Sequence, residues 1–371
     1  MLRTTLRTTL AAAALLALAA PAAAQSDILL RLRSGSPLGD RFRVDSAGGV
    51  VAISELGIGI IPFSGEGYRM MWHPFKASFR AGHADTEWDD ANHGFFSWAG
   101  GNNTVASQYA TFAFGDNTDA TANYAVAFGN NVQVSGTYGF GAGISSRCSA
   151  STCVAMGNTA NADGQGAVAL GYRVTADADY SVALGYRASA NGRTGSFTWA
   201  DASTTDSLEN SANNSFQIRA AGGIRLYTNA TTTVGVSVAA GGSSWSAISD
   251  RNRKEDFLSV DGEDILGRLR GIPVSTWRYR DEEDRSTLHI GPMAQDWHAA
   301  FGFTRDDTTI NMSDFDGVNL AAIQALEHRT TELRAEVAAV RDENAALRAA
   351  NTALEARLRR IEARLSAAPA P

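Results

Sequence analysis

The most regular feature of the chain is a 14-residue pattern in which small and large apolar positions alternate. Glycines mark the pattern and recur at that spacing without interruption: Gly101, Gly115, Gly129, Gly143, Gly157, Gly171 and Gly185. Two residues before each glycine the chain has Ala or Gly, and larger apolar residues such as Val168 and Leu170 flank that position. An alternation of period two predicts short β-strands that have one small face and one large apolar face.

The small face indicates how these strands are arranged. A strand needs a face of Ala, Gly and Ser only where backbones approach closely, as they do inside a narrow coil. One coil cannot cover its own large apolar face, so we expect coils to stack on one another and on other copies of the chain. The repeated glycine fits a turn with positive φ or a close contact between backbones. The repeat therefore predicts a mainly β fold built from stacked coils.

The repeated motif also resembles that of a known family. Ala-Val-Ala-Phe-Gly at 125–129, Ala-Val-Ala-Leu-Gly at 167–171 and Ser-Val-Ala-Leu-Gly at 181–185 are similar to the head repeat of YadA-type trimeric adhesins. The resemblance covers roughly residues 92–200 and implies a left-handed parallel β-roll with three chains side by side. The pattern departs from the family at 139–143. It departs again after the last unit, where Trp199 replaces the next glycine and is expected to close the roll.

The segment before the repeat is predicted to be rich in β-structure. Residues 25–91 are expected to form an N-terminal cap, with strands near 28–33 and 48–53. Aromatic residues within 70–75, together with Trp88, are expected to plug the first coil, because the terminal repeat of a solenoid needs a cap. A receptor-binding tip is the alternative interpretation of this segment.

The segment after the repeat contains a β neck and then a different kind of module. Residues 201–248 are polar and rich in glycine, and one pair of strands is predicted there, 215–219 with 224–227. The composition changes at Ser249. From there to 325 the pattern predicts two short helices, a strand and the start of a long helix, which together make a small α+β module.

Three features of this module resemble the intramolecular chaperone of phage tailspikes and tail fibres, the peptidase S74 family. They are the dipeptide Ser249-Asp250 followed by Lys254, the segment 289–296, and the helical pattern of 318–326. The similarity implies a module that trimerises the fibre and then releases itself by cutting the chain. Carried over to this sequence, Ser249 is the nucleophile, Lys254 is the base, and the cut falls between Ser249 and Asp250.

The chemistry of such a dyad is coherent. A serine hydroxyl is a weak nucleophile that needs a base, and lysine serves as a base only when burial or nearby cations favour its neutral form. Arg251 and Arg253 are neighbouring cations of this kind. The alternative is that Ser249 or Asp250 only caps a turn and that Lys254 is solvated. The family pattern, rather than the spacing, favours the catalytic interpretation.

The end of the chain carries apolar heptads that predict a coiled coil over 326–366. The d positions are Leu326, Leu333, Val340, Leu347, Leu354 and Ile361, and the a positions are Thr330, Val337, Asn344, Asn351, Leu358 and Leu365. Asparagine at a positions favours dimers in simple parallel coiled coils, whereas the repeat upstream implies a trimer. We expect the trimeric repeat to outweigh the dimer preference of these asparagines, so that the chain forms a homotrimer. Residues 367–371 are predicted to be a disordered tail.

The start of the chain reads as a secretory signal peptide, residues 1–24. Two arginines precede an apolar run at 10–20, and small residues precede a cleavage site between Ala24 and Gln25. The run is too short to cross a bilayer, and no transmembrane helix is expected later in the chain. The protein is therefore predicted to be exported to the periplasm, to the cell surface or to the medium.

Charge and cysteine content narrow the partners. Without residues 1–24, 30 basic residues face 39 acidic ones, and this net charge near −9 argues against nucleic acid or an anionic membrane as the main partner. Export permits a disulfide between Cys148 and Cys153; two reduced, buried thiols are the alternative. The six histidines show no paired ligand spacing, so neither a metal nor a cofactor is expected.

Together these patterns predict an exported, trimeric, adhesin-like fibre whose C-terminal chaperone drives trimerisation and cleaves itself. Its external partner is expected to be a cell-surface, glycan or matrix receptor. The enzymatic alternative is a serine endopeptidase that acts once, in cis. A prophage tail-fibre protein with a self-cleaving chaperone is a further alternative, and the signal peptide argues against it because tail fibres assemble in the cytoplasm.

Overall fold

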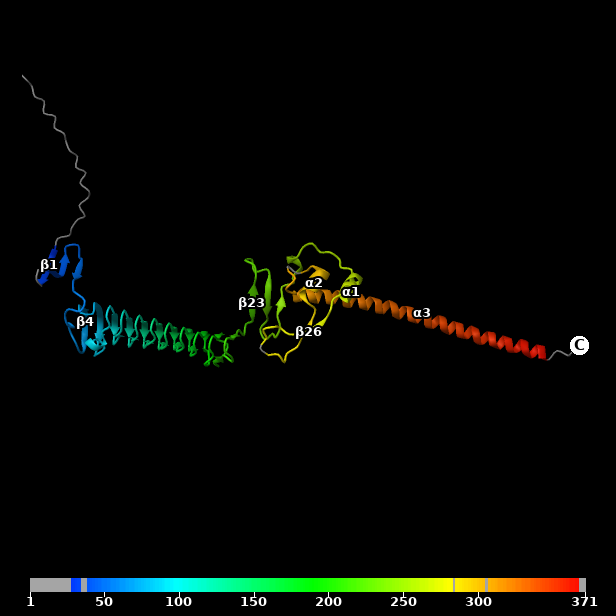
Figure 1. Cartoon of the computed structure of the whole chain (residues 1–371), viewed down its shortest axis with the longest axis horizontal. Helices are drawn as coiled ribbons and strands as arrows, with labels where there is room; N and C mark the ends of the chain where they lie inside the picture. The colour runs from blue at the N-terminus through cyan, green and yellow to red at the C-terminus, as the bar shows by residue number, and fades with distance from the viewer. Residues whose placement is uncertain (1–27, 35–38, 283, 304–305, 367–371) are drawn as a thin grey trace, which may run out of the picture. The chain divides into compact units, whose positions relative to one another are not determined.

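The computed structural model describes residues 28–366 except 35–38, 283 and 304–305 (Figure 1). The predicted signal peptide, with its cleavage site between Ala24 and Gln25, and the predicted tail at 367–371 lie outside the described residues. The described residues form two compact units: 28–224 with 239–242, and 225–238 with 243–366. No helix in the described part of the chain is long and apolar enough to cross a membrane.

The first unit is dominated by a β-solenoid in which each coil adds one longer and one shorter strand, and all of these strands run parallel to those of the neighbouring coils (Figure 1). The longer strands are β6 (Trp98–Asn102), β8 (Phe112–Asp116), β10 (Val126–Asn130), β12 (Phe140–Ile144), β14 (Val154–Asn158), β16 (Val168–Tyr172), β18 (Val182–Tyr186), β20 (Phe197–Ala200) and β22 (Phe216–Arg219). The shorter strands are β7 (Val105–Ala106), β9 (Asp119–Ala120), β11 (Gln133–Val134), β13 (Arg147–Cys148), β15 (Asn161–Ala162), β17 (Thr175–Ala176), β19 (Ala188–Ser189) and β21 (Leu208–Glu209). The predicted mainly β fold of stacked 14-residue coils is confirmed.

The register of the solenoid explains the repeated glycine. Gly157 pairs with Gly171 of the next coil and has a φ of +138°. A Cβ atom added to Gly157 would lie 1.9 Å from the carbonyl oxygen of Gly171, so any side chain there would collide with the backbone. The small positions two residues before the glycines point inward and are buried: Ala99, Ala113, Ala127, Ala155, Ala169 and Ala183. A narrow coil therefore selects both residue types.

The irregular unit at 139–143 keeps the same register, and its extra glycines compensate for larger neighbours. A Cβ atom at Gly141 would lie 2.6 Å from a methyl carbon of Val134, and one at Gly139 would lie 2.7 Å from the sulfur of Cys148. Glycine therefore replaces the usual small residue at positions 139 and 141, because Val134 and Cys148 already fill the interior of the coil there. Cys148 and Cys153 are both buried and are joined by a disulfide.

The solenoid continues past Trp199, although its strict repeat ends there. Trp199 lies in β20 between Leu184 of β18 and Ile218 of β22, and β22 adds a further parallel strand to the same sheet. The predicted pairing of 215–219 with 224–227 is therefore wrong. Both segments form strands, but β22 stacks Phe216 on Phe197 of the coil, whereas the second segment forms β23 (Ile224–Tyr227) in another sheet.

The N-terminal part of the first unit has two β elements. β1 (Ile28–Ser34), β2 (Gly39–Asp45) and β3 (Val50–Ala52) form an antiparallel sheet, and β4 (Gly67–His73) and β5 (Ser78–Ala84) form a hairpin. The hairpin extends the large sheet, because β5 pairs in parallel with β6. A short 3-10 helix, η1 (Asp90–Asn92), follows the hairpin.

The interior below the hairpin is closed by large side chains. Trp88 is fully buried and donates from Nε1 to the carbonyl oxygen of Thr104 at 2.8 Å. Arg80 pairs with Ala99 and fills the position that alanine occupies in the later coils. Of the other expected plugs, His73 is buried, whereas Trp72 lines an outer cavity.

The second unit contains a small sheet and a helical module. Its elements are β23, β24 (Gly235–Val238), β25 (Ser246–Ala247), η2 (Arg251–Arg253), α1 (Gly262–Arg270), β26 (Ser275–Trp277), β27 (His289–Gly291), α2 (Ala294–Phe301) and α3 (Met312–Ser366). The core of the module packs α1, α2 and the first turns of α3 together through Ile265, Trp297, Phe301, Val318 and Ala322. From Leu326 to Ser366 every residue of α3 is exposed in the single chain, including the apolar heptad positions.

Candidate functional site

The predicted dyad lies where the small sheet of the second unit meets η2. The segment before Ser249 is held by β25, which pairs with β24, and by a hydrogen bond from the Ile248 amide to the carbonyl oxygen of Gly235 at 3.1 Å. After Ser249 the chain turns through η2, and the amide of Lys254 donates to the carbonyl oxygen of Arg251 at 3.2 Å. This turn brings the Lys254 side chain back towards the strand.

The structure brings the two predicted dyad residues together. Lys254 Nζ lies 2.7 Å from Ser249 Oγ, a hydrogen-bonding distance. In its charged form, the lysine ammonium group donates to the hydroxyl. A neutral amine in the same place would accept the hydroxyl proton, which is the contact that a nucleophile and its base require.

The groups around the dyad have other partners. The Asp250 carboxylate caps η2 by accepting from the Asn252 amide at 2.9 Å, so the turn-capping alternative holds for Asp250. The same carboxylate forms an ion pair with Arg253 Nε at 3.4 Å, and the Arg251 guanidinium stacks 5.1 Å from the centre of the Phe257 ring. Arg253 and Arg251, the two cations predicted beside Lys254, thus contact the Asp250 carboxylate and the Phe257 ring.

The dyad is open to water in the single chain. Ser249, Asp250 and Lys254 are all exposed. Their support comes from Gly235 in β24 and from the carbonyl oxygen of Thr233, which accepts from Arg253 at 3.4 Å. The sequence did not reveal these supporting residues, because the only strand pair predicted in the neck was 215–219 with 224–227, and no strand was predicted at 235–238.

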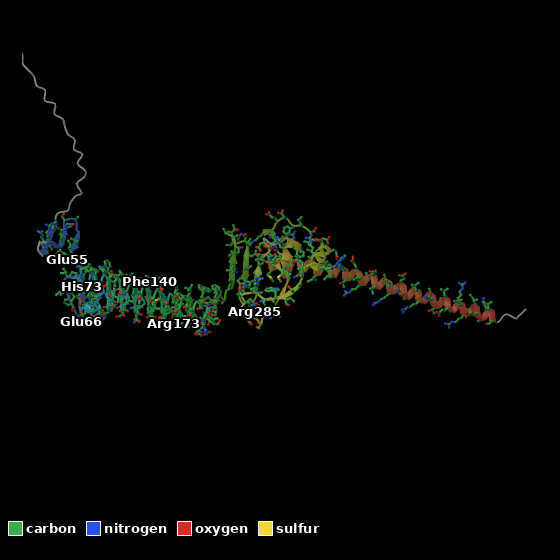
Figure 2. The ribbon with its side chains drawn as sticks, viewed as in Figure 1. Glu55, Glu66, His73, Phe140, Arg173 and Arg285 are labelled. Atoms are coloured by element: carbon green, nitrogen blue, oxygen red, sulfur yellow. A yellow bond between two sulfur atoms is a disulfide. The ribbon has the colours of Figure 1, made fainter. Side chains whose placement is uncertain are left out.

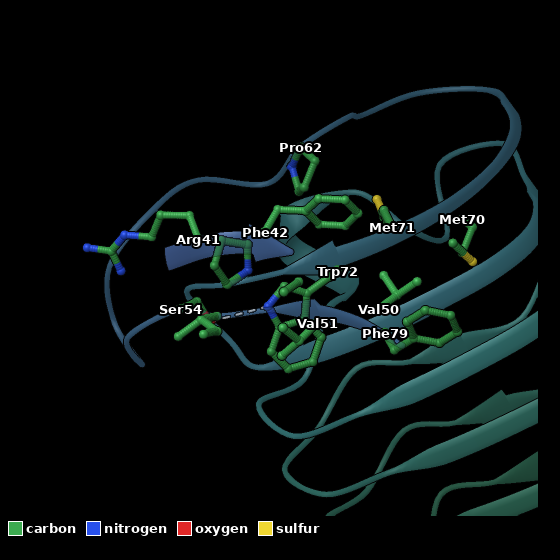
Figure 3. Close-up of a pocket in the computed structure, with 13 residues that line it drawn as sticks. Arg41, Phe42, Val50, Val51, Ser54, Pro62, Met70, Met71, Trp72 and Phe79 are labelled. Carbon is green, nitrogen blue, oxygen red and sulfur yellow. Dashed lines mark hydrogen bonds between the residues drawn. The ribbon is translucent and has the colours of Figure 1, made fainter. Parts of the chain in front are cut away.

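Two other features of the first unit gather functional side chains or enclose space. A cavity of about 760 Å³ lies between the β2–β3 sheet and the β4–β5 hairpin, lined by apolar side chains such as Phe42, Val51 and Phe79 (Figure 3). Its wall includes Trp72, whose Nε1 donates to Ser54 Oγ at 3.2 Å. This lining carries neither a nucleophile–base pair nor a group of metal ligands.

The second cluster is the buried polar interior of the cap. Arg80 donates to the carbonyl oxygens of Ser97 and Ala106 at 3.1 and 2.9 Å, and burial lowers the pKa of Arg80 to about 9. Burial, followed by the charge of Arg80, lowers the pKa of His93 to about 3. His93 Nδ1 lies 3.1 Å from Ser78 Oγ. These contacts close the first coil.

Comparison with known families agrees with both parts of the fold. Residues 249–304 match the family model of peptidase S74, the chaperone of endosialidase. Three segments of the solenoid match the YadA head domain repeat: residues 106–131, 154–173 and 175–193. No curated protein matches the chain. The chain therefore carries YadA-type head repeats followed by an S74 chaperone segment, in the predicted order. These domains support an adhesin-like or tail-fibre-like protein with an intramolecular chaperone.

Proposed function

We propose that the protein is an exported homotrimeric fibre whose C-terminal module drives trimerisation and then cuts each chain between Ser249 and Asp250. The observation that carries the proposal is the 2.7 Å contact between Lys254 Nζ and Ser249 Oγ, at the residue where the S74 match begins. Export is supported by the N-terminal sequence pattern and by the adhesin-type repeats.

The trimer is supported by apolar surface that one chain leaves uncovered. Aromatic side chains on the outside of the solenoid remain exposed, such as Phe114, and some stack from coil to coil, such as Tyr124 on Tyr138. The heptad positions of α3 are exposed as well. Contiguous apolar surface of this kind marks an interaction site. Both matched families imply a trimer, and three copies would cover both surfaces.

Assembly would also supply what the dyad lacks. A lysine acts as a base when it is desolvated, and Lys254 is exposed in the single chain. We infer that the neighbouring chains of the trimer cover Lys254 and Ser249. Cleavage would then follow trimerisation and would not occur in a chain that has not assembled.

The position of the hydroxyl determines how the cut would proceed. Ser249 Oγ and the carbonyl carbon of the scissile bond belong to the same residue, so attack within one chain would close a strained β-lactone ring. We propose that Ser249 of one chain attacks the Ser249 carbonyl of a neighbour. The hydroxyl proton passes to Lys254, the C–N bond breaks, and Asp250 leaves with a free amine. Water then hydrolyses the interchain ester to a Ser249 carboxylate.

The direct test is the mass and N-terminal sequence of purified full-length protein. Wild type should yield a fragment that begins at Asp250, and Ser249→Ala and Lys254→Met should abolish it. Ser246→Ala, in the adjacent β25, is the matched control and should cleave normally. A wild-type trimer that stays intact on prolonged incubation would overturn the protease assignment and leave a retained chaperone.

A mixing experiment tests which chain is attacked. Wild-type chains and tagged Ser249→Ala chains are co-expressed, and mixed trimers are isolated through the tag. Attack between chains should cut the tagged chains after position 249, since their carbonyl group is intact. Cleavage of the wild-type chains alone would instead assign the attack to a single chain.

The partner that such a fibre would bind is proposed from the first unit. Binding of glycans or matrix proteins by residues 25–248, and its absence from a solenoid-only fragment, would place the receptor site in the N-terminal cap. The S74 match also keeps the prophage tail-fibre alternative in view. Cell fractionation separates the two, because retention in the cytoplasm would contradict the exported fibre.

A further inference from the structure

A group of possible metal ligands lies at the open end of the β4–β5 hairpin. Glu66, labelled in Figure 2, directly precedes β4. Asp85 directly follows β5, so the two acids flank the Gly67–Ala84 pair. His83 lies two residues before Asp85 on the second strand. One ligand atom of Glu66, His83 and Asp85 each lies within 4.8 Å of the other two. These histidine and carboxylate residues come from two strands, so spacing along the sequence did not reveal them.

Hydrogen bonds along the solenoid define which nitrogen of His83 is available. The Asp116 carboxylate only accepts, so the Asn102 side chain must direct its NH2 group to Asp116, at 2.6 Å. The Oδ1 atom of Asn102 therefore faces His83 Nδ1, at 3.1 Å. An amide oxygen accepts, so Nδ1 carries a proton, and in the neutral imidazole the lone pair is then on Nε2. Asn130 binds the other oxygen of Asp116 at 2.9 Å and anchors this chain of bonds to the next coil.

The carboxylates beside His83 are short of positive charge. Among the described residues, no ion pair is found for Glu66 or Asp85. The nearby guanidinium of Arg69 donates to the carbonyl oxygen of Gly67 at 3.0 Å and lies 5.2 Å from the centre of the Trp88 ring. The His83 ring is supported on one side by Tyr68, with ring centres 4.5 Å apart. Two carboxylates and one oriented imidazole therefore lie together, and neither carboxylate has an ion pair among the described residues; Asp85 accepts only a hydrogen bond from Asn103 Nδ2, at 3.3 Å.

We propose that Glu66, His83 Nε2 and Asp85 bind one zinc ion, with water as the fourth ligand. One imidazole and two carboxylates are donors that zinc accepts, whereas calcium and magnesium prefer oxygen ligands throughout. A metal about 2.1 Å from each ligand atom would place those atoms ~3.4 Å apart, so the exposed carboxylate side chains need to close by no more than about 1.4 Å. Asn102 would serve as the outer partner that fixes the ligating histidine.

The ion would fasten the end of the fibre. The three ligands join the start of β4 to the end of β5, and Asn102 connects them to β6 of the first coil. A bound metal would therefore hold the two strands of the hairpin together at its open end, and the Asn102 hydrogen bond would link this site to the first coil. This inference concerns the first unit and does not depend on cleavage at Ser249.

Isothermal titration of full-length, chelator-treated protein with zinc chloride tests the site. Wild type should bind one zinc ion per chain. His83→Gln and Asp85→Asn should weaken binding by on the order of 100-fold, and Asn102→Ala by on the order of 10-fold, as removal of an outer partner does. Zinc should also raise the melting temperature of wild type and leave that of Asp85→Asn unchanged.

Two control variants distinguish this site from other candidates. Glu55→Gln removes another exposed acid of the first unit, and Glu282→Gln removes the partner that lies 3.1 Å from His289 Nε2. Both should bind zinc as wild type does. Unchanged affinity in Glu66→Gln and Asp85→Asn, loss in Glu282→Gln, or no binding up to on the order of 1 mM would each overturn the proposal. Because Glu66 and Asp85 are exposed, their amide variants should still fold if His83→Gln does not.

Discussion

The inward-facing apolar residues of the solenoid in the first unit are buried, whereas the apolar heptad residues of the long helix α3 in the second unit are exposed. Inside the solenoid, columns of alanine such as Ala113, Ala127 and Ala155 are fully buried by coils of the same chain. In α3, Leu333 and Leu347 are 59% and 56% exposed, and no other element of the described chain covers them. One unit completes its interior alone, while the other offers a surface for further copies.

This difference in burial shows which surfaces a single chain covers and which ones are left for other chains. A coil of the solenoid needs only its two neighbours, because backbone hydrogen bonds and small side chains close the interior. The outer aromatic face and the heptads of α3 are left uncovered in one chain, and under the proposed mechanism the exposed Ser249–Lys254 dyad also needs other chains to desolvate it. The residues left uncovered in one chain are therefore those assigned to trimerisation and cleavage.

The largest expected effect comes from charge in the heptads. Leu333→Asp combined with Leu347→Asp should reduce the mass measured by light scattering from three chains to one. Burying a carboxylate at each seam position costs several kcal/mol per copy, more than the helix can recover elsewhere. Ala335→Asp combined with Ala349→Asp is the matched control, because those residues lie on the opposite face of the heptad. A trimer that survives the leucine substitutions would place assembly in the solenoid.

Within the solenoid, the repeated glycine should be the most sensitive position. Gly157→Ala should lower the free energy of unfolding by about 3 kcal/mol or more, since the new methyl group meets the carbonyl oxygen of Gly171 at 1.9 Å. Gly192 also has a positive φ, of +70°, but has open space around it, so Gly192→Ala should cost only about 1 kcal/mol. Urea denaturation of each variant measures the two values. Equal losses would mean that backbone strain, and not close packing, selects the glycine.

Much of this solenoid could be predicted from the sequence, because every 14-residue unit repeats the same requirement for small residues inside the coil. The repeated glycine indicated that neighbouring backbones lie close together, and the alternation of Val168, Ala169 and Leu170 indicated a strand with two different faces. The end of the coil was harder to predict. β20 and β22 lack the glycine but keep apolar residues in register, so Phe216 follows Phe197 across a longer loop that no period reveals.

The candidate site was less accessible to prediction from residue patterns. Ser249 and Lys254 were found through family resemblance, since a serine near a lysine is common by chance. Their contact depends on side-chain conformation and on the pairing of β24 with β25, which spacing does not encode. The ligands around His83 were missed for a related reason, because a hairpin register brings them together.

A smaller effect tests whether the glycine at position 141 compensates for the large side chain of Val134. Gly141→Ala should destabilise the protein by about 2 kcal/mol, because its methyl group would meet Val134 at 2.6 Å. Val134→Ala leaves a cavity but removes that clash, so the double variant should be more stable than the sum of the single losses predicts, by about 1 kcal/mol. A double-mutant cycle in urea measures this coupling. Strict additivity would show that the coil accommodates the methyl group by moving its backbone.

The smallest predicted effect concerns acid and the buried cap. His93 is 3% exposed, and burial lowers its pKa from an ordinary 6.5 to about 3. The unfolded chain takes up a proton near pH 6.5 and the folded chain does so only near pH 3, so the stabilising contribution is complete above pH 6.5 and is lost as pH falls towards 3.

Between pH 7 and pH 5 this loss should amount to about 1–2 kcal/mol in the free energy of unfolding. His93→Gln should flatten the dependence over that range, which lies above the ordinary titration of carboxylates. His328→Gln is the control, because His328 is exposed on α3 and should leave the slope unchanged. Urea unfolding at pH 7, 6 and 5 gives the comparison. An unaltered slope in His93→Gln would mean that the first coil opens to water before the fibre unfolds, so that the cap is the weakest end of an otherwise self-contained solenoid.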